Sequence, residues 1–385
     1  MKIIIAVDKF KGSLSSVQVA EAARRGVKAA YPDAITVAIP VADGGDGTVD
    51  AVVATLGSDA ATAVCQVASP LPHLAPVDAT YAIVDGGRTA VTELAQASGL
   101  ALVPTHKRDA MAASTLGTGQ MIANAIAAGC RHVVVGLGGS ATTDGGTGLL
   151  SALGFRWLDS NGREVLPCGA NLSKMARVDD SAVPQAVRDT KFTLWTDVTS
   201  PLCGPQGAAR VFAPQKGADA NQVELLEAGL AHLAAPMPPH VPTTPGAGAA
   251  GGTAAGMMAW LGASVEPGAE ALLSMAHIDE ALRGASLVIT GEGRIDDQTA
   301  MGKAPAVVLS HAHQAGVPVL AITGCLATND RMDFDAVLPI VPRPMTEAQA
   351  MQPATAAVQV ERTVEQAVRL LLLNLTTNDK GTKTK

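Results

Sequence analysis

The chain has 385 residues and a formal net charge of −7, and 48% of its residues are hydrophobic although only 3% are aromatic. This length predicts two domains, and the negative charge with few aromatic residues argues against nucleic acid or an anionic membrane as a partner. The five cysteines form no CxxC pair, and the apolar run at the start is too short for a signal peptide. No stretch approaches the roughly 20 apolar residues of a membrane helix. These features predict a cytoplasmic protein.

The first 56 residues alternate between predicted strands and helices. A β-branched run at Ile3–Val7 predicts a buried parallel strand, and Ser15 with Gln18 has the spacing of a capping box that begins a helix reaching Ala30. A second strand at Ile35–Ile39 precedes a second helix at Val49–Leu56. This order is typical of a doubly wound parallel sheet.

The same alternation returns near the C-terminus, whereas the middle is less regular. Strands are predicted near the end at Leu287–Thr290, Val317–Thr323 and Val337–Val341, followed by a helix at Val358–Leu373. Strands are predicted in the middle at Tyr81–Val84, His132–Val135 and Phe192–Trp195, and helices at Thr118–Ala127 and Asn221–Leu233. We therefore expect a discontinuous Rossmann-like domain from residues 1–75 and 285–375, an inserted α/β domain at 76–284, and a disordered tail at 376–385.

Loops that join glycine to charge follow several of these strands. Ligands bind at the carboxyl ends of the strands in open α/β sheets, where helix N-termini present free N–H groups. The first such loop, Asp8–Ser13, offers Lys11 and Ser13 to an anion, but it also reads as a polar loop with a capping serine. The second, Ala42–Thr48, interleaves Asp43 and Asp46 with three glycines, which favours a magnesium or substrate contact.

A third loop, Gly136–Gly146, contains Gly138, Gly139 and Ser140 and predicts an anion nest, although it is not a Walker A loop. Further along, Asp197 lies at the end of a predicted strand, where a carboxylate that holds a metal or acts as general base is expected. Lys216, between Gln215 and Gly217, could meet a phosphate. A surface charge is the simpler interpretation of both.

The last loop, Thr290–Thr299, continues to Ala304 and concentrates opposite charges beside glycines. It carries Glu292, Arg294, Asp296 and Lys303 directly after a buried strand. By contrast, Gly246–Gly251 matches GxGxxG but follows a proline-rich stretch where a dinucleotide site requires a strand. The sequence contains neither HExxH nor GxSxG, which argues against a zinc peptidase and against an α/β-hydrolase.

Taken together, these loops resemble the type-1 glycerate kinase family from residue 1 to about residue 340. The segments that carry the resemblance are Phe10–Ser15, Val41–Thr48, Gly117–Gly119, Gly138–Thr142, Asp144–Gly146, Pro214–Gly217, Pro245–Gly252 and Ile289–Asp296. Each is weak alone, but their shared order and spacing are specific. The chain departs from the family pattern at Val7, Lys9, Thr143 and Ser200.

The resemblance implies an enzyme that uses ATP to phosphorylate D-glycerate, in most members at the 2-hydroxyl, and a Rossmann-like domain split by an inserted α/β domain. Residue chemistry and loop position suggest the roles. Catalytic candidates are Asp197, Asp296, Lys216 and Glu292; substrate or phosphate candidates are Lys11, Ser13, Gly138, Gly139, Ser140, Arg294 and Lys303; candidates for Mg²⁺ are Asp43, Asp46 and Asp197.

Several alternatives stay open at this point. Asp296 or Asp197 would accept the proton of the attacking hydroxyl, and Lys11 or Arg294 would hold the substrate carboxylate. The same fold could form 3-phosphoglycerate or use a related hydroxy acid. An NAD(P)-dependent oxidoreductase, or a nucleotide sensor without catalysis, is the alternative from another class. The sequence does not indicate whether the protein forms oligomers.

Overall fold

The computed structural model describes residues 1–297, 299, 303–328 and 332–381, with side chains to residue 373. The chain divides into two compact units. The first consists of Met1–Ala42 and Ala269–Lys385, and the second of Asp43–Gly268. A Cβ atom built on Gly268 would lie 2.7 Å from the carbonyl carbon of Asp43, so the second unit begins and ends at neighbouring residues.

A five-stranded, fully parallel sheet forms the centre of the first unit. Its strand order is β13 (Ala336–Pro339), β12 (Val319–Leu326), β11 (Leu287–Ile295), β1 (Lys2–Val7), β2 (Ile35–Ala38). The central strands are almost continuously apolar because both faces of the sheet are covered. Every carboxyl end lies at one edge, where loops after β1 and β11 carry predicted site residues.

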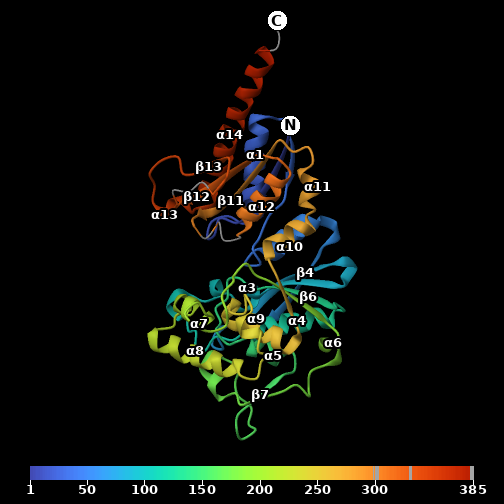
Figure 1. The fold of residues 1–385 in the computed structure, drawn as a ribbon, viewed down its shortest axis with the longest axis vertical. Helices are drawn as coiled ribbons and strands as arrows, with labels where there is room; N and C mark the ends of the chain where they lie inside the picture. The colour runs from blue at the N-terminus through green and yellow to red at the C-terminus, as the bar shows by residue number, and fades with distance from the viewer. Residues whose placement is uncertain (298, 300–302, 329–331, 382–385) are drawn as a thin grey trace. The chain divides into compact units, whose positions relative to one another are not determined.

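Helices α1, α12 and α14 of the first unit pack on this sheet, and three shorter helices complete the described part of the unit (Figure 1). They are α1 (Ser16–Ala30), α10 (Gly268–Met275, starting at the last residue of the second unit), α11 (Ile278–Leu282), α12 (Ala304–Gln314), α13 (Glu347–Ala350) and α14 (Pro353–Gly381). Helices α1 and α14 pack closely, since a Cβ on Gly26 would lie 2.3 Å from the carbonyl oxygen of Glu361. The apolar side of α14, at Val360, Val364 and Val368, repeats every four residues and joins the core over β1.

The second unit has a six-stranded mixed sheet in the order β10 (Ser264–Glu266), β9 (Lys191–Trp195), β6 (His132–Gly136), β5 (Thr89–Glu93), β4 (Val77–Val84), β3 (Ala61–Val67). The first four strands in this order are parallel, whereas β4 and β3 pair antiparallel. A small antiparallel pair, β7 (Arg156–Leu158) and β8 (Arg177–Asp179), is separate from this sheet. The parallel strands again bring several loops to one edge.

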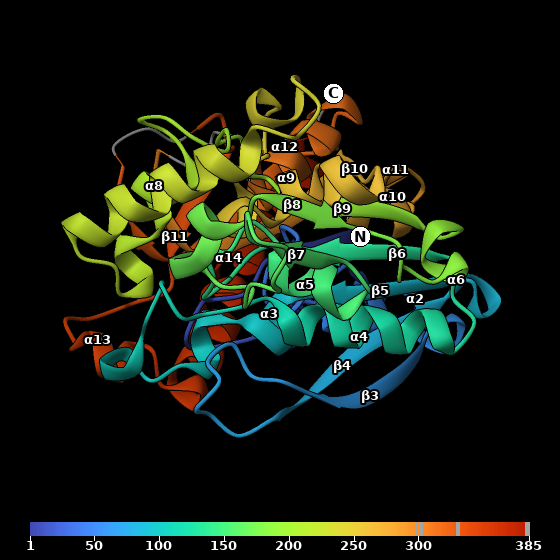
Figure 2. The same cartoon turned by 90° about the horizontal axis from the view of Figure 1, so that it is seen from below.

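The helices of the second unit vary from one turn to four. They are α2 (Thr48–Leu56), α3 (Leu94–Ser98), α4 (Leu116–Ala127), α5 (Thr147–Ala152), α6 (Gln185–Arg188), α7 (Ala208–Phe212), α8 (Ala220–Ala234) and α9 (Ala249–Leu261). Figure 2 shows α4 lying along the sheet. Met121 and Ile122 of α4 are fully buried with Val133 and Val135 of β6, so this packing forms the core of the unit.

The expected fold class, α/β with a doubly wound parallel sheet and a second α/β domain, is confirmed. The predicted capping box at Ser15 and Gln18 is also present. The units begin and end at other residues than expected: 43–75 belong to the second unit and 269–284 to the first. The hairpin β3–β4 explains the former, since it pairs with β5.

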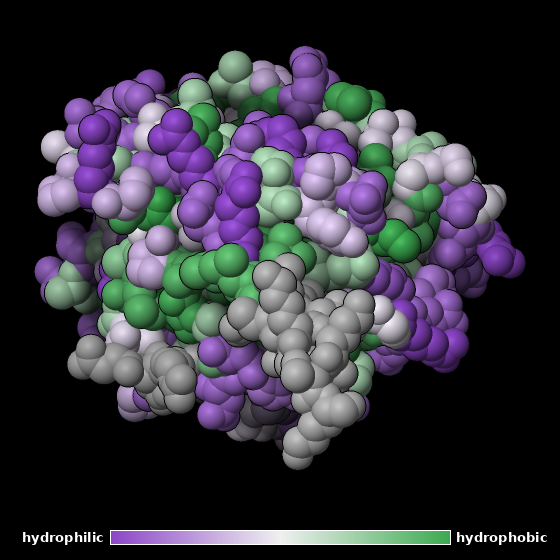
Figure 3. Space-filling view, turned by 90° about the horizontal axis from the view of Figure 1, so that it is seen from above, coloured by the Kyte–Doolittle hydropathy of each residue, from purple (hydrophilic) through white to green (hydrophobic). Residues whose placement is uncertain are grey.

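The C-terminal helix is longer than the sequence predicted. Because α14 continues to Gly381, it includes 376–381 of the segment expected to be disordered, and 382–385 lie outside the described residues. On the face drawn in Figure 3, apolar patches alternate with polar ones. The side chains of Leu370 and Leu373 of α14 are exposed. Within the described part of the chain, no helix has the length and apolarity of a membrane span.

Candidate active site

In the first unit, the loops after β1 and β11 pack against each other. The Asp8 N–H donates to the carbonyl oxygen of Gly291 over 2.9 Å. A Cβ on Gly293 would lie 3.2 Å from the Lys11 nitrogen, which leaves little room for any side chain there. The structure therefore brings Lys11 and Ser13 to the same sheet edge as the predicted charged loop.

Opposite charges in that loop pair with one another. The Nζ of Lys303 lies 3.6 Å from Oε2 of Glu292 and 3.7 Å from Oδ1 of Asp296. The Thr299 hydroxyl donates to Oε1 of Glu292 over 2.6 Å, and Arg294 lies 3.3 Å from Asp296. The charge of Lys303 is thus partly offset by two carboxylates before any ligand binds.

Two other cations of this edge face solvent. Lys11 is exposed, and the side chain of Arg294 is 66% exposed. The Ser13 hydroxyl is buried, and none of the residues that the structure describes offers it a hydrogen bond. Lys11 and Arg294 are therefore accessible to an anionic substrate at this edge.

In the second unit, the Asp43–Thr48 loop packs directly on the ends of β6 and β9. The Gly138 N–H donates to the carbonyl oxygen of Gly44 over 3.0 Å. Gly44 has φ +81°, and a Cβ there would lie 2.5 Å from the carbonyl oxygen of Trp195. A Cβ on Gly138 would lie 2.4 Å from the Cα of Gly45. Only glycines allow this approach of two backbones.

The three carboxylates predicted for magnesium follow strand ends or lie in the loop that packs on them, but the structure does not bring them into one cluster. A Cβ on Gly139 would lie 3.9 Å from the Cβ of Asp46. Asp197 follows β9, and its Oδ1 accepts the Gly268 N–H over 3.0 Å, while Gly268 also packs against Asp43. Among the described residues, no three His, Cys, Asp or Glu side chains converge into a complete metal site.

Lys216 is buried beneath Ser140. Its side chain comes from the 3₁₀ turn η6 (Pro214–Lys216), and its Nζ donates to the Ser140 hydroxyl over 2.8 Å and to the carbonyl oxygen of Thr142 over 2.5 Å. Burial lowers the pKa of Lys216 to about 7, although the charge of Asp144 opposes this shift. The lysine that the sequence placed beside a phosphate therefore reaches Ser140 from inside the protein.

A further buried group, Asp144, shapes the loop after β6. Asp144 is fully buried and accepts hydrogen bonds from the N–H and hydroxyl of Thr115 and from the N–H groups of Gly146 and Gly148. Burial raises the pKa of Asp144 despite these bonds. The carboxylate fixes the start of α5, so its role is structural.

Glu93 is the site residue that sequence reasoning missed. It is fully buried at the end of β5, and its carboxylate accepts N–H bonds from Gly47, over 3.0 Å, and from Val49. Burial raises its pKa to about 7, and the charges of Asp46 and Asp50 add to this effect. The sequence does contain a feature that could have indicated Glu93. The short run Thr89–Thr92 is followed directly by this carboxylate, as the strand at Phe192–Trp195 is followed by Asp197.

The GxGxxG segment has another purpose. It follows the 3₁₀ turn η7 (Val241–Thr243), whereas a dinucleotide site would require a strand before it. Gly251 has φ +65°, and a Cβ there would lie 2.1 Å from the carbonyl oxygen of Thr142. The glycines let α9 begin in contact with the loop after β6.

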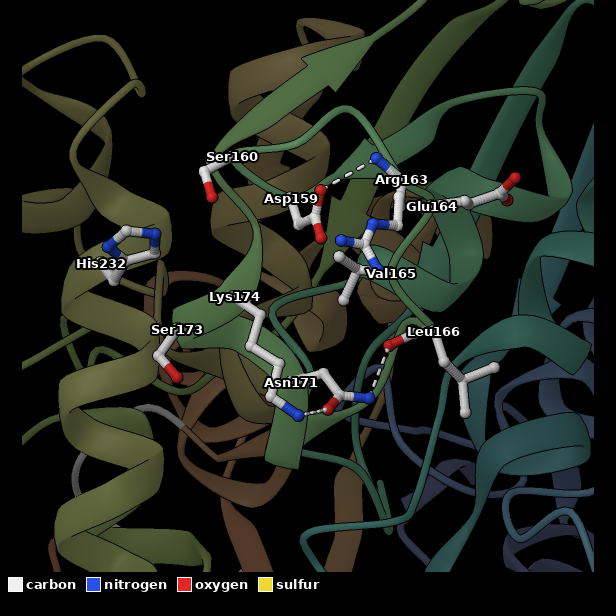
Figure 4. Close-up of a pocket in the computed structure, with 11 residues that line it drawn as sticks. Asp159, Ser160, Arg163, Glu164, Val165, Leu166, Asn171, Ser173, Lys174 and His232 are labelled. Carbon is white, nitrogen blue, oxygen red and sulfur yellow. Dashed lines mark hydrogen bonds between the residues drawn. The ribbon is translucent and has the colours of Figure 1, made fainter.

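A cavity of about 570 Å³ lies elsewhere in the second unit, between the β7–β8 pair and α8 (Figure 4). Arg163, Lys174 and His232 line it, and the Lys174 ammonium donates to Asn171 over 2.8 Å. None of the predicted site residues lines this cavity.

Comparison with known proteins identifies relatives of this arrangement. The model of the glycerate kinase family matches residues 3–372. Glycerate kinase of Bacillus subtilis is 41% identical over 94% of this chain and 96% of its own. Glycerate 2-kinase of Escherichia coli is 42% identical over 85% of this chain and 86% of its own.

A solved structure agrees with these sequence matches. The crystal structure of a candidate glycerate kinase 2 from Salmonella typhimurium LT2 superimposes with a TM-score of 0.83 and 37% identity, covering 98% of this chain and 99% of the other. The chain has glycine-rich loops at the carboxyl ends of parallel strands in both sheets, a family model that matches nearly its whole length, and relatives near 40% identity. These findings lead to one conclusion: this chain belongs to the glycerate kinase family.

Proposed function

We propose that this enzyme transfers the γ-phosphoryl group of ATP to the 2-hydroxyl of D-glycerate and releases ADP and 2-phosphoglycerate. The observation that carries the proposal is the edge of the second sheet, where the Gly138–Ser140 turn lies beside Asp46. Membership of the glycerate kinase family supports the choice of substrate.

The Gly138–Ser140 turn is our candidate for binding a phosphate of the nucleotide. Backbone N–H groups and the Ser140 hydroxyl are donors that suit phosphate oxygens. Ser140 is 8% exposed and is held by Lys216, so the hydroxyl is oriented before a ligand arrives. Preorganised donors of this kind stabilise charge without reorganisation cost during the reaction.

Asp43, Asp46 and Asp197 are our candidates for holding Mg²⁺. Their carboxylate oxygens are the hard ligands this ion prefers, and Mg²⁺ commonly takes one or two carboxylates together with water and substrate phosphates. The proposal therefore needs only one or two of these carboxylates to contact the ion. Bound there, the ion would neutralise phosphate charge.

For the substrate side we propose Lys11 or Arg294 as the partner of the glycerate carboxylate, because both are exposed at one edge of the first sheet. Asp296 or Asp197 would accept the proton of the attacking hydroxyl. Glu292 holds Thr299 and Lys303, so we assign it to positioning this loop rather than to proton transfer.

The proposal is tested by incubating the protein with Mg-ATP and D-glycerate, following ADP release and treating the product with enolase. Glycerate-dependent ADP release with a product that enolase dehydrates directly is expected. A product that enolase accepts only after phosphoglycerate mutase would mean phosphorylation at the 3-hydroxyl. Absence of glycerate-dependent release would contradict the proposal.

A further inference from the structure

Lys216 is a buried ammonium group whose direct partners are uncharged. Its side chain is 2% exposed, and both acceptors that it contacts, the Ser140 hydroxyl and the Thr142 carbonyl, are neutral. Among the described residues, no carboxylate lies within ion-pair distance of its Nζ. An isolated buried cation is costly because the interior replaces its hydration poorly.

The charged groups around Lys216 already have other partners. Asp144, whose charge favours the protonated form of Lys216, accepts four hydrogen bonds from Thr115 and the start of α5. Arg108 and Asp109 lie with Lys216 around a packing gap that has no room for a water molecule. Arg108 donates to the carbonyl oxygen of Gln215, while Asp109 accepts N–H bonds from Met111 and Ala112.

The neighbouring helix adds no counter-charge. Arg210 of α7, which packs on η6, forms a surface ion pair with Glu224 of α8. Burial accordingly lowers the pKa of Lys216 to about 7, so much of the amine is neutral at mildly alkaline pH.

We propose that Lys216 takes up a proton from solvent when a phosphate oxyanion of the nucleotide binds beside Ser140. The inference rests on the proposed function and deepens it. The bound anion supplies the counter-charge that the protein lacks near Lys216, and opposite charge favours the protonated amine. Phosphate binding and protonation of Lys216 then strengthen each other, as linkage requires.

The Ser140 hydroxyl transmits this coupling. When the amine is neutral, the hydroxyl can donate its hydrogen to the lone pair of Nζ. When the amine is protonated, Nζ donates to Ser140, and the hydroxyl hydrogen is released to a phosphate oxygen. Both states fit the 2.8 Å distance between Nζ and Oγ. Lys216 is therefore a positioning residue whose charge is completed by the ligand.

Isothermal titration calorimetry tests this coupling directly. The full-length protein is titrated with Mg-ADP at about pH 8 in buffers of different ionisation enthalpy, such as Hepes and Tris. The slope of binding enthalpy against ionisation enthalpy gives the protons taken up. With a pKa near 7 in the free protein, the expected uptake approaches about 0.9 proton per nucleotide.

Three variants assign the proton. Lys216→Arg keeps a permanent charge, so Mg-ADP should bind with an uptake near zero. Lys216→Met should bind more weakly and also without uptake. Lys191→Met changes an exposed lysine at the opposite end of β9 and should leave uptake at the wild-type value. Thermal unfolding checks that each variant is folded. If Lys216→Met does not fold, Lys216→Arg alone tests whether Lys216 takes up the proton.

The outcomes separate this inference from the proposed function. Binding heat with no buffer dependence in the wild type overturns the inference but leaves nucleotide binding intact. Uptake that persists in Lys216→Arg assigns the proton to another group and also overturns it. No binding of Mg-ADP or Mg-ATP at any pH would instead contradict the proposed function.

Discussion

Asp197 shows how one carboxylate can serve structure and chemistry at the end of β9. Its Oδ1 accepts the Gly268 N–H, which fixes the orientation of the side chain. Asn at this position keeps an oxygen acceptor for that bond, removes the charge and replaces the second oxygen by an amide NH₂. The substitution of Asp197 by Asn therefore separates the structural hydrogen bond from the role of the negative charge in catalysis.

We predict that Asp197→Asn lowers kcat on the order of a hundredfold, as expected for loss of a general base or metal ligand. The concentration of Mg²⁺ needed for half-maximal rate should rise if the carboxylate holds the ion. Stability should change little because the bond to Gly268 is retained. Steady-state kinetics across a magnesium series checks this, and near wild-type kcat with unchanged magnesium dependence would remove Asp197 from the site.

Gly44 shows how tightly the carboxylate loop must approach the sheet. We predict that Gly44→Ala destabilises the protein by about 3 kcal/mol, since strain from positive φ adds to overpacking against Trp195. Gly87→Ala is a matched control, because Gly87 has φ +91° but open space around it, so it should cost only about 1 kcal/mol. Denaturant unfolding measures both, and equal losses would show that the close contact is unimportant.

At the scale of elements, Glu93 connects the end of β5 to the start of α2. Acidic groups stabilise helix N-termini, but this one is deeply buried, so its charged form is disfavoured. Its pKa rises from 4.5 to about 7 on folding. The folded state therefore binds more protons than the unfolded state between these values, and stability falls as pH rises from 4.5 to 7.

We predict that Glu93→Gln removes this part of the pH dependence. The free energy of unfolding of wild type, measured in urea at several pH values, should decrease relative to the variant as pH rises through this range. Parallel curves for the two proteins would contradict the raised pKa. The variant also loses one of two N–H acceptors, so kcat should fall as the Asp46 loop loosens.

A second element-scale device joins α10, α11 and α12. His311 of α12 bonds Asp279 of α11 at 2.8 Å and Glu270 of α10 at 3.1 Å. Burial lowers its pKa, but the bonds to Asp279 and Glu270 outweigh burial, and the net pKa lies above 6.5. The stabilisation is present below pH 6.5 and lost as pH rises through the raised pKa.

We predict that the midpoint temperature of thermal unfolding of the wild type falls, relative to that of His311→Gln, as pH rises from 6.5 through the raised pKa of His311. His313→Gln, on the exposed side of the same helix, is the control and should follow wild type. A wild-type curve that parallels His311→Gln at all pH values would show that the ring bonds contribute nothing.

Sequence patterns predicted what depends on neighbours along the chain. The strand at Ile3–Val7 and the cap at Ser15 need only local periodicity and spacing, and both are present. The burial of Lys216 and the bonds of Glu93 depend on contacts between distant segments. No local pattern carries such contacts, which is why Lys216 was expected to meet a ligand directly and Glu93 was overlooked.

At the scale of the whole molecule, the two units have separate sheets and separate cores. The second unit is one continuous segment, so we predict that residues 43–268 expressed alone fold cooperatively. Circular dichroism and urea unfolding would check this, and a fragment without a cooperative transition would show that the second unit needs the first. The first unit, being discontinuous, offers no such fragment.

The neighbouring positions of Asp43 and Gly268 have a consequence for the order of folding. While the second unit is unfolded, it is a very long loop between β2 and α10, and closing it costs on the order of 5 kcal/mol of chain entropy. Once that unit has folded, its two ends are already side by side and the loop is effectively only a few residues long. The parallel pairing of β1 with β11 then closes a much shorter effective loop, formed by residues 8–42 and 269–286. We therefore expect the inserted unit to fold first and to accelerate the formation of the sheet that surrounds it in the sequence.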